Sequence, residues 1–275
     1  MTPRTGLRNG AVCVAGLGVA MASRRRAQRQ VGILHDVADG TKFRRCVEWL
    51  LERYTIVSLA DLLSANREPG RARLALTFDD GYADWYDVAA PVLTDLRCPA
   101  TFFVSSGFVG LEGSSASRFK REQLRRSRDL APLSRSQLAE LAGCPLFDIG
   151  SHTASHIDFA QNVSSETLVT EIDGDLKLLE DLTQQRVNWF AYPFGGERQL
   201  SPLVVDHVRG AGFEAAFTAL PGSLDTASDR FLLPRQSIDL LGGRLLWQAR
   251  LNGGYELVFR ARQRAFRALG RTPTR

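Results

Sequence analysis

The feature that most constrains the fold is a regular alternation of short β-type runs and helical patterns from residue 31 onward. The β-type runs are apolar, whereas the segments between them place apolar residues three and four positions apart. Strands that alternate with helices in this way are typical of a parallel sheet. The predicted strands are VGILH (31–35), YTIV (54–57), RLALTF (73–78), ATFFV (100–104), LFDIG (146–150), NWFAY (188–192) and EAAFT (214–218).

The segments between these runs predict helices, several of them with capping residues. Ser134, Ser164 and Ser201 lie where N-caps are expected, and Gly143 and Gly212 lie where helices end. About seven strand–helix units fit a distorted or incomplete (β/α) barrel. A doubly wound open sheet is the alternative. The predicted helices cover residues 42–54, 87–96, 134–143, 164–183 and 201–212.

Length, composition and charge are those of a globular protein with a mildly basic surface. The 275 residues are 44% hydrophobic and 24% charged, which argues against disorder and against a polytopic membrane protein. The net charge is +5, with arginines crowded at 23–29, at 118–128 and in the C-terminal tail. No nucleic-acid-binding motif accompanies these clusters, so we expect solvated surface or peripheral membrane contact and no nucleic-acid partner. The four cysteines lack CxxC spacing and predict free thiols: Cys13, Cys46, Cys98 and Cys144.

The two ends of the chain differ from the alternating region. Residues 11–22 are an apolar stretch too short to span a bilayer, which fits either a signal peptide or a helix lying on a surface. Residues 244–271 carry apolar and arginine residues at helical spacing and predict one amphipathic helix, packed on the barrel or lying at a membrane surface. We therefore divide the chain into an N-terminal segment (1–30), a main domain (31–240) and a C-terminal basic helix (241–275).

Two adjacent carboxylates end one of the predicted strands. Asp79 and Asp80 follow the apolar run RLALTF and precede a glycine. Asp-Gly is ordinary turn chemistry, so a turn is one interpretation. The other is a functional site, because the carboxyl ends of parallel strands are where such folds build their sites.

Two histidines follow another predicted strand. His152 and His156, in FDIGSHTASHIDF, would lie on one face if a helical turn begins there, and could then share a metal ion. Two imidazoles and one carboxylate leave coordination positions open for water and substrate, which is typical of catalytic metal sites. The second aspartate could then serve as a general base.

Three ordered motifs resemble those of a known family. TFDDG, SHTASH and FAYPFG look like the first three signature motifs of the NodB-homology polysaccharide deacetylases, carbohydrate esterase family four. The resemblance extends from about residue 31 to about residue 239. The forms FAYPFG and ILHDV are most similar to the bacterial poly-N-acetylglucosamine deacetylases. The resemblance implies a distorted barrel that hydrolyses N-acetyl groups on an amino-sugar polymer.

The resemblance also implies roles for residues of the three motifs. Asp80, His152 and His156 would bind a divalent metal, usually zinc, and Asp79 would be the general base. A backbone N–H near Tyr192 is a second candidate donor to the oxyanion. The expected groove wall is formed by Phe190, Tyr192, Pro193 and Phe194.

The chain departs from the family pattern at two positions. Many members carry, in the third motif, an arginine that orients the catalytic aspartate, but Ala191 stands at that place. Arg235, in FLLPRQSI, is the expected substitute. The late histidine that serves many members as general acid is also missing, so His35 becomes the candidate acid, with a core histidine as the alternative. His207, in the middle of a predicted helix, is expected to be structural.

Other readings of the sequence remain open. A metal-dependent amidohydrolase for small molecules would use the same site with a different groove. The chain could also be a catalytically weak relative that binds glycans. A further alternative is an interaction protein directed by its basic tail. The long segment 105–132 could flank a substrate groove. We expect a monomer, and favour a cell-envelope or membrane-associated location over a cytoplasmic one.

Overall fold

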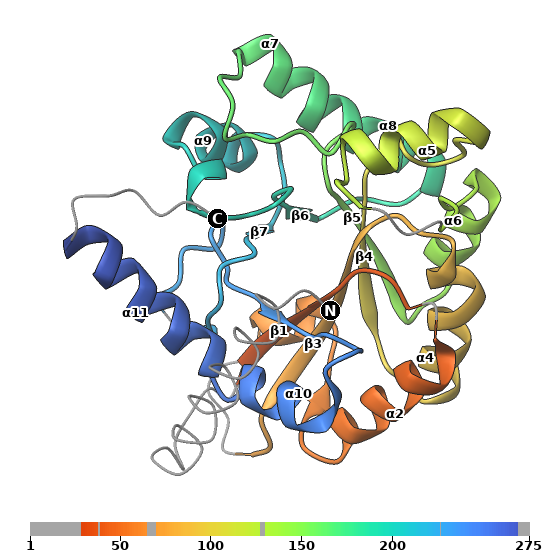
Figure 1. The fold of residues 1–275 in the computed structure, drawn as a ribbon. Helices are drawn as coiled ribbons and strands as arrows, with labels where there is room; N and C mark the ends of the chain where they lie inside the picture. The colour runs from red at the N-terminus through yellow and green to blue at the C-terminus, as the bar shows by residue number, and fades with distance from the viewer. Residues whose placement is uncertain (1–28, 38, 65–69, 127–129, 226, 269–275) are drawn as a thin grey trace.

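The computed structural model of the protein describes residues 29–37, 39–64, 70–126, 130–225 and 227–268. It shows a curved parallel sheet surrounded by helices (Figure 1). The sheet order is β7-β6-β5-β4-β3-β1-β8, with β2 also paired to β3. The pairings between these strands are all parallel. The strands are β1 Arg29–Leu34, β2 Thr55–Ile56, β3 Arg73–Asp80, β4 Ala100–Val104, β5 Phe147–Ser151, β6 Trp189–Ala191, β7 Ala215–Phe217 and β8 Gln236–Ser237.

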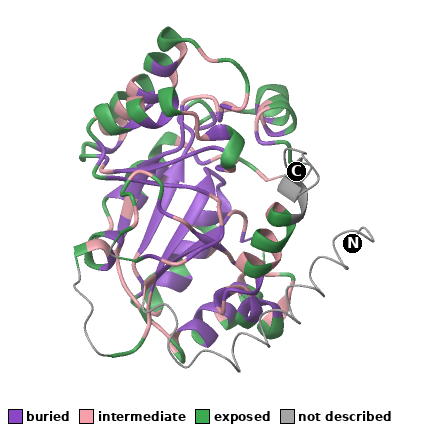
Figure 2. Cartoon of the chain, turned by 90° about the vertical axis from the view of Figure 1, so that its left-hand side faces the viewer, coloured by how far each residue is buried: buried purple, intermediate pink, exposed green. Residues whose placement is uncertain are grey.

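The two edges of the sheet approach each other, so the fold is a distorted (β/α) barrel and the doubly wound alternative is wrong. Phe217 of β7 forms a parallel bridge with Leu233, three residues before β8 begins. Apolar side chains on the inner face of the sheet pack together, among them Phe103, Trp189 and Phe217. Figure 2 shows the buried strands at the centre and helices with exposed outer faces around them.

The helices form where the apolar periodicity predicts them, and their caps explain their limits. The Ser134, Ser164 and Ser201 side chains each accept a hydrogen bond from a backbone N–H of the following turn. Gly143 is the C-cap of α6. The helices are α2 Gly40–Leu51, α3 Leu59–Ser64, η1 Trp85–Ala89, α4 Ala90–Asp95, α5 Gly113–Glu122, α6 Arg135–Ala142, α7 Ser165–Leu168, η2 Val169–Asp173, α8 Gly174–Thr183, η3 Glu197–Gln199, α9 Pro202–Gly210, α10 Gly243–Leu251 and α11 Gly254–Ala268.

Four elements were not predicted from the sequence, one of them the three-residue η3. The two-residue strand β8 is too short to show periodicity. Helix α3 has only six residues. Helix α5 lies in the segment 105–132 and buries only Ala116 and Lys120 among its ten residues, so its helical pattern is weak.

The C-terminal region is two helices, so the prediction of one continuous helix is wrong. The chain breaks at Asn252 and Gly253, where Gly253 has a φ of 83°, a left-handed conformation that glycine adopts without strain. Helix α10 packs on the barrel, with the Trp247 ring 5.7 Å from the Trp49 ring of α2. Within the described ranges, none of the helices combines the length and apolar character needed to cross a membrane.

Some predictions concern residues outside the described ranges. Most of the N-terminal segment (1–30), with Cys13, lies within the undescribed residues 1–28, whereas residues 29 and 30 belong to β1 and not to a separate segment. The other three cysteines are free, with Cys46 and Cys98 buried and Cys144 partly buried. Helix α9 ends at Gly210, two residues before Gly212, which has a φ of 102°.

Gly150 in β5 gives a test of the close packing inside the sheet. A Cβ atom at this position would lie 2.4 Å from Phe103 Cδ1 and 3.1 Å from the Trp189 carbonyl oxygen. We expect Gly150→Ala to lower the free energy of unfolding by roughly 1–3 kcal/mol, because the buried Phe103 ring has to move. Urea unfolding measures this loss.

The matched control is Gly210→Ala at the end of α9, where nothing lies within 4 Å of the added Cβ. It should leave stability unchanged or raise it by up to about 1 kcal/mol. Equal effects of the two substitutions would contradict the packing argument.

Candidate active site

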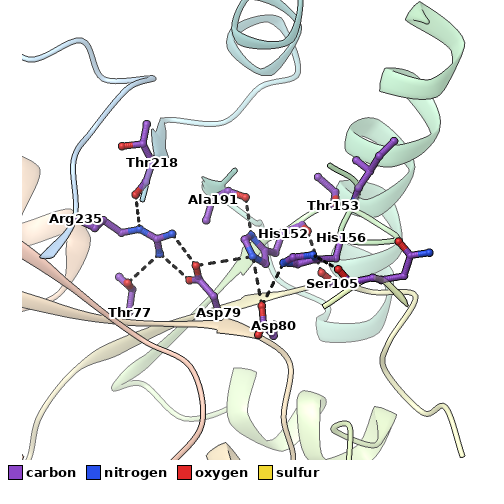
Figure 3. A network of polar contacts seen from close by, with 12 residues as sticks. Thr77, Asp79, Asp80, Ser105, His152, Thr153, His156, Ala191, Thr218 and Arg235 are labelled. Carbon is purple, nitrogen blue, oxygen red and sulfur yellow. Dashed lines mark hydrogen bonds and ion pairs between the residues drawn. The ribbon is translucent and has the colours of Figure 1, made fainter. Parts of the chain in front are cut away.

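The predicted metal ligands meet Asp79 and Arg235 at the carboxyl end of the parallel strands (Figure 3). Asp79 and Asp80 end β3, and His152 directly follows β5. Parallel strands bring these ends to one edge of the barrel. The residues line a cavity of about 370 Å³, whose wall includes His35, Asp79, Asp80, His152 and His156.

The backbone at the end of β3 explains how two neighbouring carboxylates can face one pocket. In an extended strand, adjacent side chains point to opposite faces. Asp80 instead has a φ of 99°, and Gly81 has a φ of 110°. Both carboxylates therefore lie near one imidazole, with Asp79 Oδ2 and Asp80 Oδ1 each 3.8 Å from His152 Nε2. The Asp-Gly sequence is thus part of a site and not only a turn.

Asp79 forms a buried, two-pronged ion pair with Arg235. Nη1 and Nη2 of Arg235 each donate to one carboxylate oxygen at 2.7 Å. Arg235 also donates to the Thr218 carbonyl at 2.9 Å and to Thr77 Oγ1 at 3.2 Å. Burial acts to raise the pKa of Asp79, but the Arg235 guanidinium, together with His152 and His35, holds this pKa below its usual range. Asp79 is therefore charged at neutral pH and fixed in orientation.

Asp80, His152 and His156 form a set of potential metal ligands. One ligand atom from each lies within 4.8 Å of the others. His156 Nε2 is 3.4 Å from Asp80 Oδ1, and His152 Nε2 is 3.8 Å from the same oxygen. These distances leave the three donor atoms around a common point.

The two histidines meet through an irregular loop and not through the helical turn that their spacing would allow. The chain leaves β5 at Ser151, and Thr153 and His156 adopt left-handed conformations with φ of 62° and 55°. His152 is anchored by its backbone N–H, which donates to the Val104 carbonyl. The two left-handed residues turn the chain so that the His152 and His156 rings lie 4.9 Å apart without a helix.

Backbone carbonyls orient both imidazoles toward the pocket. His152 Nδ1 lies 2.7 Å from the Ala191 carbonyl oxygen, and His156 Nδ1 lies 3.2 Å from the Gln123 carbonyl oxygen. A carbonyl only accepts, so each Nδ1–H donates and each Nε2 keeps its lone pair for a ligand. The Asp80 atom Oδ2 is buried, accepts no hydrogen bond from the described residues and lies 4.0 Å from Arg126 Nε. This donor set fits a divalent cation such as zinc.

Burial sets the charge states of these ligands. It lowers the pKa of His152 to about 4, although Asp79 acts in the opposite direction. Burial also acts to raise the pKa of Asp80, but His156, His35 and His152, when protonated, together outweigh burial, and this pKa is lowered. A neutral imidazole and a charged carboxylate are the forms that bind metal.

His35 lies on the wall of the same cavity, just after β1. Its backbone carbonyl accepts a hydrogen bond of 2.7 Å from the Trp85 indole. Burial lowers the pKa of His35, while the Asp80 carboxylate acts to raise it. The structure thus brings His35 to the site that the sequence assigned to it.

The third motif contributes only part of the expected groove wall. Tyr192 and Phe194 line the cavity. Phe190 does not: it is fully buried, with its ring 5.1 Å from Tyr192 and 5.2 Å from Phe213. Side chains alternate along β6, so Phe190 points to the helical layer while its neighbours point inside. Pro193 is buried and is not part of the cavity wall either.

Asp175 of α8 supports the histidine loop from behind and was missed by the sequence analysis. Its carboxylate accepts hydrogen bonds from Ser106 N at 3.0 Å and from Ser151 Oγ at 2.6 Å. Ser105 Oγ donates to the carbonyl of His152 at 3.0 Å. The one available signal was an acidic residue within the apolar pattern of a helix. Other unpredicted residues of the cavity wall include Arg125, Arg126 and Tyr255.

The chain belongs to the polysaccharide deacetylase family. Residues 66–216, which include the aspartate pair, both histidines and the third motif, match the family model for polysaccharide deacetylases. The resemblance to the NodB-homology enzymes of carbohydrate esterase family four is thereby confirmed. Members of this family are hydrolases that act on carbon–nitrogen bonds.

Individual relatives are distant. YxkH of Bacillus subtilis, provisionally named a polysaccharide deacetylase, is 21% identical to this chain over 220 residues. The alignment covers 76% of this chain and 71% of YxkH. The chain is 26% identical over 218 residues to the poly-β-1,6-N-acetyl-D-glucosamine N-deacetylase of Escherichia coli, covering 68% of this chain but only 31% of that enzyme. The structure of IcaB from Ammonifex degensii matches with a TM-score of 0.61 at 20% identity, over 80% of this chain and 96% of that one. This likeness supports the barrel fold.

Asp175 predicts a measurable pH dependence of stability. Burial raises the pKa of its carboxyl from 3.8 to about 6, so the folded chain binds this proton more tightly than the unfolded chain. The stabilisation is full below about pH 4 and is lost as the pH rises through about 6. We expect Asp175→Asn to reduce the fall in unfolding free energy between about pH 4 and pH 7, by at most about 3 kcal/mol.

Urea unfolding at several pH values measures this change. The exposed Asp206 on α9 supplies the control substitution Asp206→Asn, which should leave the pH profile as in the parent. An unchanged profile for Asp175→Asn would show that the Asp175 carboxyl does not titrate in this range.

Proposed function

We propose that the protein removes N-acetyl groups from an amino-sugar polysaccharide of the poly-N-acetylglucosamine type, with a divalent cation as cofactor. The observation that carries this proposal is the ligand set of Asp80, His152 and His156 directly beside the arginine-held Asp79. The name of the Escherichia coli relative supports the choice of polymer. The intact ligand set argues against a relative that only binds glycans.

Asp80, His152 and His156 would hold the cation, with zinc as the expected ion. When bound, a divalent cation there would polarise the acetyl carbonyl and make a water molecule more acidic. Asp79 would take the proton from the attacking water. The depressed pKa of Asp79 makes it a weak base, so it can act only on an acidified water. Arg235 fixes the base without competing for the ligand set.

The leaving amine requires a proton from a second group. His35 reaches the same cavity from β1 and is our candidate donor to the amine nitrogen. The backbone N–H of Tyr192 donates to the Phe217 carbonyl at 3.0 Å, so it is committed to the sheet. Pro193 has no N–H, and the next along the chain is that of Phe194, which lines the cavity. This N–H is our candidate oxyanion donor.

An acetate-release assay tests the proposed function. Purified protein is incubated with N-acetylglucosamine oligomers and with small N-acetyl compounds, each with added zinc and with excess chelator. We expect acetate from the oligomers only when the metal is present. Equal rates on small compounds would favour a small-molecule amidohydrolase, and release of acetate after exhaustive chelation would reject the metal-dependent mechanism.

We also propose three further properties that were predicted from the sequence. They are the division of the chain near residue 240, the monomeric state and the cell-envelope location. Size-exclusion chromatography with light scattering measures the second, and fractionation of the source cells measures the third.

Substitutions in the aspartate pair should separate metal binding from catalysis. We expect Asp79→Asn to keep the metal but to lower turnover by roughly 10²–10⁴-fold, because the general base is lost. Asp80→Ala should lose metal, because one of three ligands is removed. Metal analysis of the purified variants, alongside thermal unfolding, distinguishes the two; equal loss of metal in both would contradict the assignment.

Substitution of His35 tests the proton donor. We expect His35→Ala to lower kcat by roughly 10²-fold or more while metal content stays unchanged, because His35 is outside the ligand set. His207→Ala is the matched control, since His207 lies on α9 and contacts Asp173 at 3.1 Å instead of the cavity. Turnover equal to that of the parent would make His35 a structural histidine.

A further inference from the structure

The C-terminal helix α11 supplies a residue to the active-site cavity. Tyr255, in its first turn, lines the cavity together with Ser237 of β8. Figure 1 shows α11, in dark blue, leaving α10 and lying along the outside of the strands. Tyr255 is beyond residues 66–216, the part of the chain that matches the family model. This wall of the cavity is therefore built from a region that the family match does not include.

The elbow between α10 and α11 is fixed against the barrel. Arg250 donates to Ser237 Oγ at 2.8 Å and to the Ser237 carbonyl at 3.3 Å. Its guanidinium carbon lies 5.8 Å from the centre of the Tyr255 ring. Tyr255 also packs against the small apolar cluster of Leu246 and Ala249. The ring is thus held in place by contacts on its own side of the cavity.

The far part of α11 is also attached to the site region. The side-chain amide of Gln263 donates to the Glu197 carboxylate in η3, which follows the third-motif loop. The residue before the elbow, Arg250 of α10, thus contacts β8, and Gln263 of α11 contacts η3. Between these two contacts, Tyr255 lies on the cavity wall.

The other two aromatic rings of the cavity wall have structural duties. Tyr192 is 1% exposed, and its hydroxyl donates to the Phe231 carbonyl at 3.0 Å. The Phe194 ring lies 4.7 Å from the His156 ring and 4.4 Å from the Arg125 guanidinium carbon. Tyr255 is partly exposed on the wall of the cavity.

We propose that Tyr255 forms a sugar-binding subsite for the unit next to the one being deacetylated. This inference rests on the proposed function. A pyranose ring has an apolar face of C–H groups that packs on an aromatic ring, and the phenol can hydrogen-bond to its hydroxyls. A ring already held by its neighbours loses little conformational entropy on binding. The subsite would favour oligomers over single sugars.

Steady-state kinetics on a tetramer of N-acetylglucosamine and on a monomeric N-acetylglucosaminide test this subsite in the zinc-loaded protein. We expect Tyr255→Ala to raise KM for the tetramer about ten-fold with kcat unchanged, because the lost contact is equal in the ground and transition states. KM for the monomer should stay the same. Tyr255→Phe should keep most of the tetramer affinity.

Leu257→Ala is the matched control, because Leu257 is on the same helix and is 37% exposed. It should behave as the parent on both substrates. A Tyr255→Ala variant with an unchanged tetramer KM would overturn the proposal. So would an equal loss of kcat on both substrates, because that result indicates a structural role.

Calorimetry with the chelated protein separates this inference from the proposed function. Tetramer binding should weaken about ten-fold in Tyr255→Ala and stay unchanged in Leu257→Ala, whether or not the protein releases acetate. If the parent binds the tetramer but has no deacetylase activity, the proposed function fails while the subsite stands. If the parent and Tyr255→Ala bind equally, or the parent binds no tetramer, the subsite fails.

Discussion

The buried ion pair between Arg235 and Asp79 is the interaction on which the site depends. Two adjacent carboxylates, each 2% exposed, would repel each other and would be costly to bury if both were uncompensated. Arg235 neutralises one of them through two hydrogen bonds and leaves the other to the histidines. The partners are 156 residues apart in the chain, so the pair also joins the region before β8 to the end of β3. One contact thus balances the charge of Asp79 and links the chain entering β8 to the end of β3.

The site uses unusual backbone conformations where regular ones would separate its side chains. Asp80, Thr153 and His156 all have positive φ, which costs conformational energy in residues other than glycine. These reversals bring a carboxylate from β3 and two imidazoles from the loop after β5 to a common point. The supporting contacts come from backbone carbonyls at Ala191 and Gln123, so the identity of those side chains matters little. The aspartate-orienting arginine expected at position 191 is not needed there, because Arg235 holds Asp79.

The cavity is also shaped by regions outside the three motifs. The segment between β4 and α6 contributes Arg125 and Arg126 to the wall, as its unusual length suggested. The C-terminal helices contribute Tyr255 and pack on the barrel through Trp247. The cavity thus combines residues of the three motifs with wall residues from outside them. Such walls are where substrate preference is expected to differ among proteins with one fold.

The sequence by itself determined the alternation of strands and helices, the distorted barrel, the family and the identity of the residues that meet at the site. Periodicity and ordered motifs are local properties, so a single chain displays them directly. Even Arg235 was predicted, although only from the resemblance, since no local pattern links it to Asp79. His35 was also proposed from the resemblance. Its place after a strand fits that role, because the carboxyl ends of parallel strands share one edge of the sheet.

Only the tertiary structure decided how those residues are oriented. The spacing of His152 and His156 allowed a helical turn, but the chain forms a loop with two left-handed residues there. The direction of Phe190 depends on the pleat of β6 between two packed layers, and the break at Gly253 depends on how α10 and α11 fit the barrel. Asp175 and Tyr255 join the site through contacts between distant segments. Such contacts leave no periodic signal in the sequence, because they exist only once the barrel has formed.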